Sequence, residues 1–150
     1  MREVDKIIIH CSDSTFGDEP TIDAWHKARG WDGTGYHYVI LNGMLKAGAP
    51  YNKVCDGALQ VGRHREKRGA HCLGQNENSI GIVLIGRSYF TSFQLLHALP
   101  MLLTRLYKEY KLTPHDVYGH SDFNKNKTCP NIDIIQYRRF LWAHFIAENR

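Results

Sequence analysis

Two runs rich in β-branched residues constrain the fold of this chain most, one at 6–12 (KIIIHCS) and one at 79–86 (SIGIVLIG). Both runs are short for a helix and apolar on both faces, as interior strands are. Glycine bounds the second run, which also favours a strand. Helical patterns separate and follow these runs, so strands and helices alternate. The alternation predicts an α/β fold in which a central mixed sheet is flanked by helices.

Three segments carry helical patterns. Pro20 and Thr21 open a helix over 22–29, which Gly30 can end. Leucines repeat at helical spacing through 91–110, but Pro100 falls inside that stripe. Because proline removes a backbone donor and clashes with the preceding turn, we expect a kink or a break there. Residues 133–148 form the last amphipathic helix, and a short strand at 116–120 precedes it.

Asn42-Gly43 is the strongest turn signal in the chain, since it lies between two apolar runs. It predicts a β-hairpin with strands at 35–41 and 44–47. Strand alternation then places Tyr36 on one face with Tyr38, and His37 on the other. Residues 48–78 show no sustained periodicity and are predicted to form a long loop, which in a compact domain is usually functional or disordered.

Size and composition favour one domain over residues 1–150. The 150 residues are 43% hydrophobic, which suits a single core. No apolar run approaches the roughly 20 residues that span a bilayer, and the charged start is followed by only three isoleucines, so we expect neither a transmembrane helix nor a signal peptide. The four cysteines form no C-x-x-C pair and are expected to be free thiols.

The chain has a modest net charge of +4, and its most basic segment is 63–68, RHREKR. This segment is either a solvated loop or a surface that attracts a polyanionic polymer. Basic and acidic residues alternate along the chain and form no basic stripe, which argues against a nucleic-acid-binding domain with a structural zinc.

The segment 120–130 combines metal-binding and charged groups in one loop: His120, Lys127 and Cys129, followed by Pro130. Zinc prefers nitrogen and sulfur ligands, and a catalytic zinc takes three of them from the protein. The third ligand must come from elsewhere. His10 is the preferred candidate because it ends a buried strand, where ligands collect in α/β sheets. The sequence alone also leaves His71, His64 and His37 open.

Neighbouring groups suggest how such a site would work. His10 and Cys11 point to opposite faces of a strand and should not bind the same ion; a lone His10 could also be a hydrogen-bonded core residue. With zinc bound, the site would catalyse hydrolysis of an acyl bond. Lys127 could stabilise an oxyanion, and Tyr36 could donate a hydrogen bond or assist proton transfer. The alternatives are a solvated lysine and a packed tyrosine.

Taken together, these segments resemble the zinc-dependent N-acetylmuramoyl-L-alanine amidases of the phage T7 lysozyme and peptidoglycan-recognition-protein type. The similarity covers nearly the whole chain and depends on the order and spacing of its pieces. Those pieces are IHCS at 9–12, WHK at 25–27 with GW at 30–31, GYHYVI at 35–40, GAH at 69–71, NSIGI at 78–82, GH at 119–120 and KTCP at 127–130.

The resemblance implies a single zinc ion at His10, His120 and Cys129, with Tyr36 and Lys127 as the catalytic pair. It implies cleavage of the amide between N-acetylmuramic acid and the L-alanine of the stem peptide, so the partner is peptidoglycan. His71 is implied to lie in the substrate groove. We expect Trp25 and Asn78 there too, although a tryptophan at the exit of the first helix could equally pack in the core.

The resemblance also suggests a biological setting. No length is left for a separate cell-wall-binding module, which looks like the compact endolysins of phages that infect Gram-negative hosts. Such a protein would be made in the cytoplasm without a signal peptide, act on the wall after release, and work as a monomer. The alternatives are a non-catalytic peptidoglycan-binding protein on the same scaffold, whose known members lack the cysteine ligand, and an amidase for another acyl-amino-acid bond.

Overall fold

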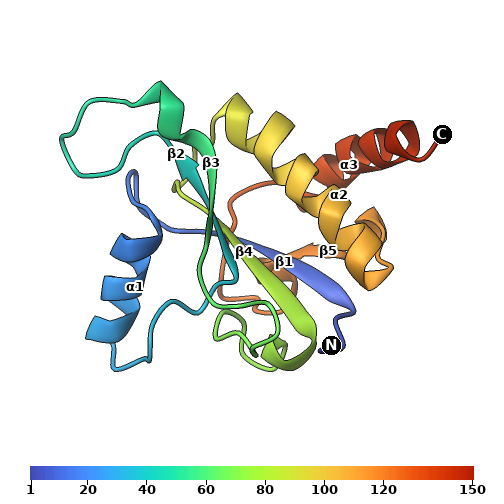
Figure 1. The fold of residues 1–150 in the computed structure, drawn as a ribbon, viewed down its shortest axis with the longest axis horizontal. Coiled ribbons are helices and arrows are strands. Elements are labelled where there is room, and N and C mark those ends of the chain that lie inside the picture. Colours follow the sequence, from blue (N-terminus) through green and yellow to red (C-terminus); the bar gives the residue numbers. More distant parts are fainter.

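The computed structural model describes all residues from Met1 to Arg150 as one α/β domain built on a five-stranded sheet (Figure 1). The strands are β1 (Lys6–Cys11), β2 (Tyr38–Asn42), β3 (Asp56–Val61), β4 (Ser79–Leu84) and β5 (Val117–Gly119), and the helices are α1 (Glu19–Ala28), α2 (Leu99–Tyr110) and α3 (Ile134–Glu148). The strand order is β3-β2-β4-β1-β5. The predicted fold class, a mixed sheet flanked by helices, is confirmed.

β1 and β4 lie side by side in the interior of the sheet, as their apolar runs predicted. They pair in parallel, with His10 opposite Val83, and β1 also pairs in parallel with β5. Every residue of β4 is buried, since helices cover both faces of the sheet. The parallel arrangement brings the carboxyl ends of β1, β4 and β5 to one edge, where the chain continues into loops.

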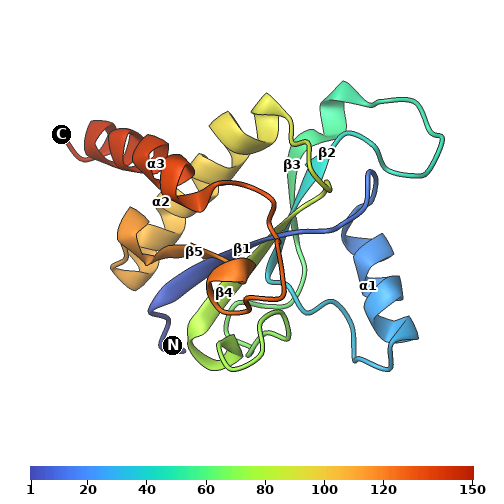
Figure 2. The same ribbon diagram turned by 180° about the vertical axis from the view of Figure 1, so that it is seen from behind.

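The two faces of the sheet have different cores. The larger cluster joins alternate residues of β1, β2 and β4 to α2 and α3, and its centre includes Ile9, Ile82 and Leu103. The smaller cluster packs Val39 and Val83 beneath Ile22 of α1. Figures 1 and 2 show this division, with α1 on one side of the sheet and α2 and α3 on the other. His10 belongs to the α1 side, because it alternates with Ile9.

The predicted hairpin is wrong. β2 pairs antiparallel with β3, not with residues 44–47, which form no strand. The Asn42 side chain accepts a hydrogen bond from the Met44 amide, at 3.0 Å, and the Met44 carbonyl accepts one from the Gly17 amide, at 2.8 Å. These contacts turn the chain toward the segment before α1. The return strand therefore comes from within 48–78, which was predicted to be loop throughout.

The face assigned to Tyr36 is also wrong. Tyr38 packs in the larger cluster, as alternation predicts, but Tyr36 packs against the smaller one, on the α1 side. The reason is that β2 begins only at Tyr38, so alternation does not extend back to Tyr36. The correction matters for function, because it places the phenol on the same side of the sheet as His10.

The helices agree with their sequence signals. Asp18 caps α1, with Pro20 in its first turn. The segment 91–110 changes character near Pro100, as expected: a π-helical stretch over Phe93–Ala98 passes into α2. In a π-helix each N–H bonds to the carbonyl five residues earlier, one further than in an α-helix. Pro100 therefore lies in the first turn of α2, where its missing N–H breaks no hydrogen bond of the α-helix interior. None of the helices is long and apolar enough to cross a membrane.

The basic segment 63–68 is largely paired with acidic side chains. Arg63 contacts Asp32 at 2.8 Å and Arg65 contacts Glu109 at 2.6 Å. Arg68 lies 3.4 Å from Glu77. Exposed pairs of this kind contribute little to stability, but they offset the positive charge that a polyanion would meet. The structure favours the reading of this segment as a solvated loop.

Candidate metal centre

Three side chains from two distant parts of the chain meet at the edge of the sheet: His10 from β1, and His120 and Cys129 from the segment after β5. Their ligand atoms all lie within 4.8 Å of one another. The rings of His10 and His120 are 4.7 Å apart, and Cys129 Sγ lies 3.8 Å from His10 Nδ1. They are the one group of histidine, cysteine or acidic residues in the chain that is arranged to hold a metal ion. The sequence predicted this group.

The segment 120–130 folds back on itself to bring its two ends together. His120 follows β5 directly, and the Ser121 amide donates to the Cys129 carbonyl at 2.9 Å. Gly119 permits this close return, because a Cβ atom there would lie 2.8 Å from Pro130 Cδ. Figure 2 shows this segment crossing beside the end of β1 on its way to α3. Cys129 reaches β1 as a result, where the Cys11 amide donates to its Sγ at 3.2 Å.

His10 and Cys11 separate as alternation predicted. His10 is 1% exposed and faces the cluster. Cys11 is also buried, and Asn131 donates to its sulfur at 3.7 Å. All four cysteines are free thiols, as expected. The Cys11 thiol and burial raise the pKa of Cys129, whereas the N–H that Cys11 donates to its sulfur lowers this pKa and so favours the thiolate form that binds metal.

Burial keeps the histidines of the cluster neutral, and neutral imidazole is the form that binds a metal. Loss of solvent lowers the pKa of His10 well below its usual value, and the nearby His71 and His120 lower it further. Burial lowers the pKa of His120 too, with a further effect from the charge of Lys127. The lysine therefore lies close enough to act on the cluster electrostatically.

Tyr36 lies beside the cluster. Its ring centroid is 5.0 Å from that of His10 and 5.5 Å from that of His26. Burial raises the pKa of Tyr36, and the neighbouring Cys129 and Cys11 raise it further, so the phenol keeps its proton at neutral pH. A protonated phenol next to this group of candidate metal ligands can donate a hydrogen bond to a substrate oxygen.

Lys127 is exposed and has no ion-pair partner in the structure. Its amide donates to the Asn124 carbonyl at 3.0 Å, which fixes the turn just before Cys129. The ammonium group is thus carried on an ordered loop next to the cluster and is free to meet an anionic group of a ligand.

The other histidines named from the sequence lie outside the ligand cluster. His71 is buried behind His10, with its Nδ1 atom 2.9 Å from His10 Nε2. His37 accepts a hydrogen bond from the Gly81 amide at 3.0 Å and donates to the Lys67 carbonyl at 2.8 Å. His64 is exposed. None of these three has a ring nitrogen in the cluster.

The two remaining predicted substrate contacts lie apart from each other. Trp25 packs against the smaller core cluster, 6.0 Å from the ring of Phe16. Asn78 precedes β4 and donates to Asp5 at 2.9 Å, at the opposite end of the strands from His10. The register separates that end from His10 by about 13 Å along β1. The structure does not bring Asn78 together with the metal ligands.

Sequence reasoning did not identify His26 and Ser79 as part of the site. His26 accepts a hydrogen bond from the Gly35 amide at 2.9 Å, which fixes the backbone next to Tyr36. Ser79 Oγ lies 3.2 Å from His71 Nε2. The only sequence signal for either residue is its place in a segment that resembles the amidases, since hydropathy and spacing do not distinguish them.

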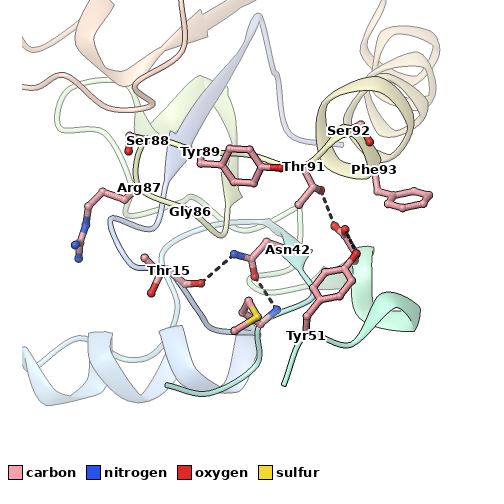
Figure 3. A pocket seen from close by; sticks show the side chains of 12 residues that line it. Thr15, Asn42, Tyr51, Gly86, Arg87, Ser88, Tyr89, Thr91, Ser92 and Phe93 are labelled. Carbon is pink, nitrogen blue, oxygen red and sulfur yellow. Dashed lines mark hydrogen bonds between the residues drawn. The ribbon is translucent and has the colours of Figure 1, made fainter. Parts of the chain in front are cut away.

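A cavity of about 700 Å³ lies at the ends of β2 and β4 and contains none of the predicted site residues (Figure 3). Thr91 donates to Asp56 Oδ1 at 2.6 Å and Tyr51 donates to the other carboxylate oxygen. Asn42 donates to the Thr15 carbonyl at 3.1 Å. These polar groups of the cavity wall thus bond to one another.

Comparison with known proteins agrees with the geometry. The family described as N-acetylmuramoyl-L-alanine amidase matches residues 1–132. The endolysin of Klebsiella phage KP32 is 30% identical over 148 residues, covering 89% of this chain and 84% of the phage protein.

Solved structures give the same result. N-acetylmuramoyl-L-alanine amidase LysC from Clostridium intestinale URNW superimposes with a TM-score of 0.77 at 27% identity, covering 93% of this chain and 86% of LysC. The complex of peptidoglycan recognition proteins LCa and LCx with tracheal cytotoxin gives a TM-score of 0.71 at 25% identity, covering 96% of this chain and 87% of the matched one. The chain therefore belongs to the N-acetylmuramoyl-L-alanine amidase family, is an amidase by that membership, and is related to phage endolysins.

Proposed function

We propose that this amidase works with one zinc ion held by His10, His120 and Cys129, and that Tyr36 and Lys127 act on the substrate. The observation that carries the proposal is the convergence of two imidazoles and one thiol, from two distant parts of the chain, within 4.8 Å of one another. The bond cleaved would be the amide between N-acetylmuramic acid and the L-alanine of the stem peptide.

The donor set fits zinc, and one spacing within it is close to that of a tetrahedral site. Zinc binds histidine nitrogen at about 2.0–2.1 Å and cysteine sulfur at about 2.3 Å, so tetrahedral ligands lie roughly 3.3–3.7 Å apart. The distance of 3.8 Å between Cys129 Sγ and His10 Nδ1 is close to that range. Three protein ligands leave one position for water or substrate, which is the pattern of a catalytic rather than a structural zinc site.

A zinc ion bound there would activate water and polarise the scissile carbonyl. The residues around it supply the remaining requirements of amide hydrolysis. Tyr36 stays protonated, because burial raises its pKa, and donates a hydrogen bond to the developing oxyanion. Lys127 lies close enough to His120 to lower the pKa of that imidazole, and its ammonium would add positive charge at the same oxygen. His26 holds the backbone that presents Tyr36.

Peptidoglycan is the proposed substrate. The bound tracheal cytotoxin in the LCa and LCx complex supports a muramyl peptide as the recognised group. Contacts of the polymer with Trp25, His71 and Asn78 remain predictions, as does action as a monomer. A role as a phage endolysin, acting on the wall after release from the cell that makes it, is supported by the similarity to the KP32 endolysin.

The zinc assignment is tested by metal removal and by one substitution. EDTA should abolish release of stem peptide from purified peptidoglycan, and added Zn²⁺ should restore it. Cys129→Ser should lower zinc content and activity by at least about 10²-fold, because the thiolate carries the only negative charge among the ligands. Cys55→Ser is the matched control, since Cys55 is a free thiol outside the cluster.

Mass spectrometry of the digest identifies the bond. New amino termini at L-alanine, with the glycan intact, are the expected products. New reducing sugar ends would make the chain a glycosidase and contradict the proposal. Full activity of Cys129→Ser in the presence of EDTA would exclude the metal centre.

A further inference from the structure

The two ring nitrogens of His10 have different surroundings. Nδ1 faces the cluster, 3.8 Å from Cys129 Sγ, whereas Nε2 faces away from it, 2.9 Å from His71 Nδ1. A histidine ligand must present an unprotonated nitrogen to the metal, and the hydrogen bond made by its other nitrogen decides which one that is. The contact with His71 therefore governs whether His10 can serve as a ligand.

A short chain of buried hydrogen bonds extends from His10 into the sheet. His71 Nε2 lies 3.2 Å from Ser79 Oγ, and Ser79 Oγ donates to the Gln75 carbonyl at 2.6 Å. Ser79 is 0% exposed and His71 8% exposed, so water does not compete freely for these groups. Both nitrogens of His71 are engaged inside the protein.

Counting protons along this chain gives one arrangement. The Gln75 carbonyl can only accept, so it takes the single hydroxyl proton of Ser79. Ser79 Oγ must then accept from His71, which places the proton of His71 on Nε2. His71 Nδ1 is left without a proton and accepts from His10 Nε2. The remaining nitrogen of His10, Nδ1, carries its lone pair toward Cys129 and His120.

The ring of His71 has little freedom to change this pattern. A Cβ atom on Gly81 would lie 2.5 Å from His71 Cγ, and one on Gly69 would lie 2.5 Å from His71 Cδ2, so the ring packs closely against both glycines. The Asn76 side chain accepts from the amides of His71 and Cys72, at 2.8 and 2.9 Å, and anchors the loop. Neither the ring nor its backbone can turn without displacing these neighbours.

We propose that His71 and Ser79 are positioning residues that set the tautomer and orientation of His10, so that its Nδ1 is preformed as a metal ligand. The proposal rests on the zinc site of the proposed function, but it concerns metal affinity and not the reaction. His71 would act through His10 without touching the metal. Outer partners of this kind typically contribute 10- to 100-fold to metal affinity.

The first test needs no substitution. Long-range ¹H–¹⁵N spectra of the histidine rings distinguish the two tautomers of neutral imidazole. Spectra of the wild-type protein, metal-free and zinc-loaded, should show a protonated Nε2 on His10 and on His71, with zinc shifting the Nδ1 resonance of His10. A protonated Nδ1 on His10 in both states would overturn the proposal.

The second test measures the dissociation constant of zinc by competition with a chromogenic chelator. His71→Ala should raise the dissociation constant by about 10- to 100-fold. Ser79→Ala should raise it less, because His71 remains. His71→Gln, whose amide can still accept and donate, should recover part of the loss. His64→Ala is the control, since His64 is an exposed loop histidine, and should bind zinc like the wild type.

The outcomes separate this proposal from the proposed function. Failure of the wild-type protein to bind zinc would overturn the function, and the spectra of the metal-free protein would still decide the tautomer. Zinc binding with the same dissociation constant in wild type, His71→Ala and Ser79→Ala would overturn the positioning role alone. If circular dichroism shows that His71→Ala is unfolded, Ser79→Ala and the wild-type spectra decide.

Discussion

The proposed role of Tyr36 depends on one hydroxyl group, which makes a conservative test available. Tyr36→Phe keeps the ring against His10 and removes the donor. We expect kcat to fall by about 10²-fold or more, the usual contribution of an oxyanion donor or a proton-transfer group, with zinc content and melting temperature unchanged. Steady-state kinetics on a defined muramyl peptide, together with metal analysis, provide the measurement.

Tyr38→Phe is the matched control, because Tyr38 lies two residues away but packs in the larger core, on the other face of the sheet. Its kcat should equal that of the wild type. Equal losses in the two variants would indicate a general effect of removing a phenol near β2 and would contradict a catalytic role for Tyr36.

His37 predicts how stability depends on pH. Burial lowers the pKa of His37 from 6.5 to about 4, and its Nδ1 already accepts from the Gly81 amide, so a proton there would face another donor. The unfolded chain takes up the proton near pH 6.5, while the folded protein does not until about pH 4. The contribution of His37 to the free energy of unfolding is therefore fully present above pH 6.5 and decreases as the pH falls below it.

The size of this effect follows from the two pKa values. At pH 5 the loss attributable to His37 is about 2 kcal/mol relative to pH 7.5. Urea unfolding of the metal-free protein at both pH values gives the decrease in the free energy of unfolding. This decrease should be smaller by about this amount in His37→Gln than in the wild type, because glutamine cannot titrate. Identical drops in the two proteins would show that His37 takes up its proton in the folded state.

At the scale of the elements, the segment between β5 and α3 determines whether Cys129 reaches β1. Gly119 has φ of −98°, so an alanine would fit its backbone, but its Cβ would lie 2.8 Å from Pro130 Cδ and 3.0 Å from Ile134 Cγ1. Gly119→Ala should push the start of α3 and the adjacent cysteine away from His10. We expect a zinc dissociation constant at least about 10-fold higher and a lower melting temperature.

Gly74→Ala separates displacement of the loop from loss of a glycine as such. Gly74 has φ of +83° with nothing within 4 Å of an added Cβ, so its substitution adds backbone strain without a clash. It should lower the melting temperature slightly and leave zinc affinity unchanged. Unchanged zinc affinity in Gly119→Ala would show that the loop tolerates the added methyl group.

The elements also show what the sequence could and could not predict. β1 and β4 were predictable because interior parallel strands are apolar on both faces. β3 was not, since its residues DGALQV are only partly buried at the edge of the sheet and carry no clear alternation. β2 pairs with β3 despite a strong hairpin signal, and the Asn42 side chain bonds to the Met44 amide and the Thr15 carbonyl.

The same distinction applies to the site. His120 and Cys129 were identifiable because they share a loop and have the chemistry that zinc prefers. His10 was preferred on its position at the end of a buried strand. The contacts of His71 with His10 and Ser79 depend on how the loop at 69–78 lies over the sheet, and that arrangement has no local sequence signature. An amphipathic pattern predicts which side chains are buried, but it does not predict which buried side chains contact one another.

At the scale of the whole molecule, a bound zinc ion would connect the first strand to the segment after the last. Because the ion would bind the folded protein and not the dispersed ligands of the unfolded chain, it should raise the free energy of unfolding by about 4 kcal/mol at a free zinc concentration 1,000-fold above its dissociation constant. Urea unfolding in a zinc buffer, compared with EDTA, measures the change.

Cys129→Ser gives the comparison for this prediction. Its stability without metal should be close to that of metal-free wild type, and added zinc should raise it little. An equal increase in both proteins would mean that zinc stabilises the fold at some other place than the His10, His120 and Cys129 cluster.

The order of the ligands along the chain has a consequence for biosynthesis. His10 is translated before its partners, which lie at residues 120 and 129. Translation proceeds from the amino terminus, so a nascent polypeptide carries only one of the three proposed ligands until residue 120 has been added. If the proposed zinc site is right, activity requires synthesis to pass Cys129, and truncated translation products that stop before residue 129 should be inactive.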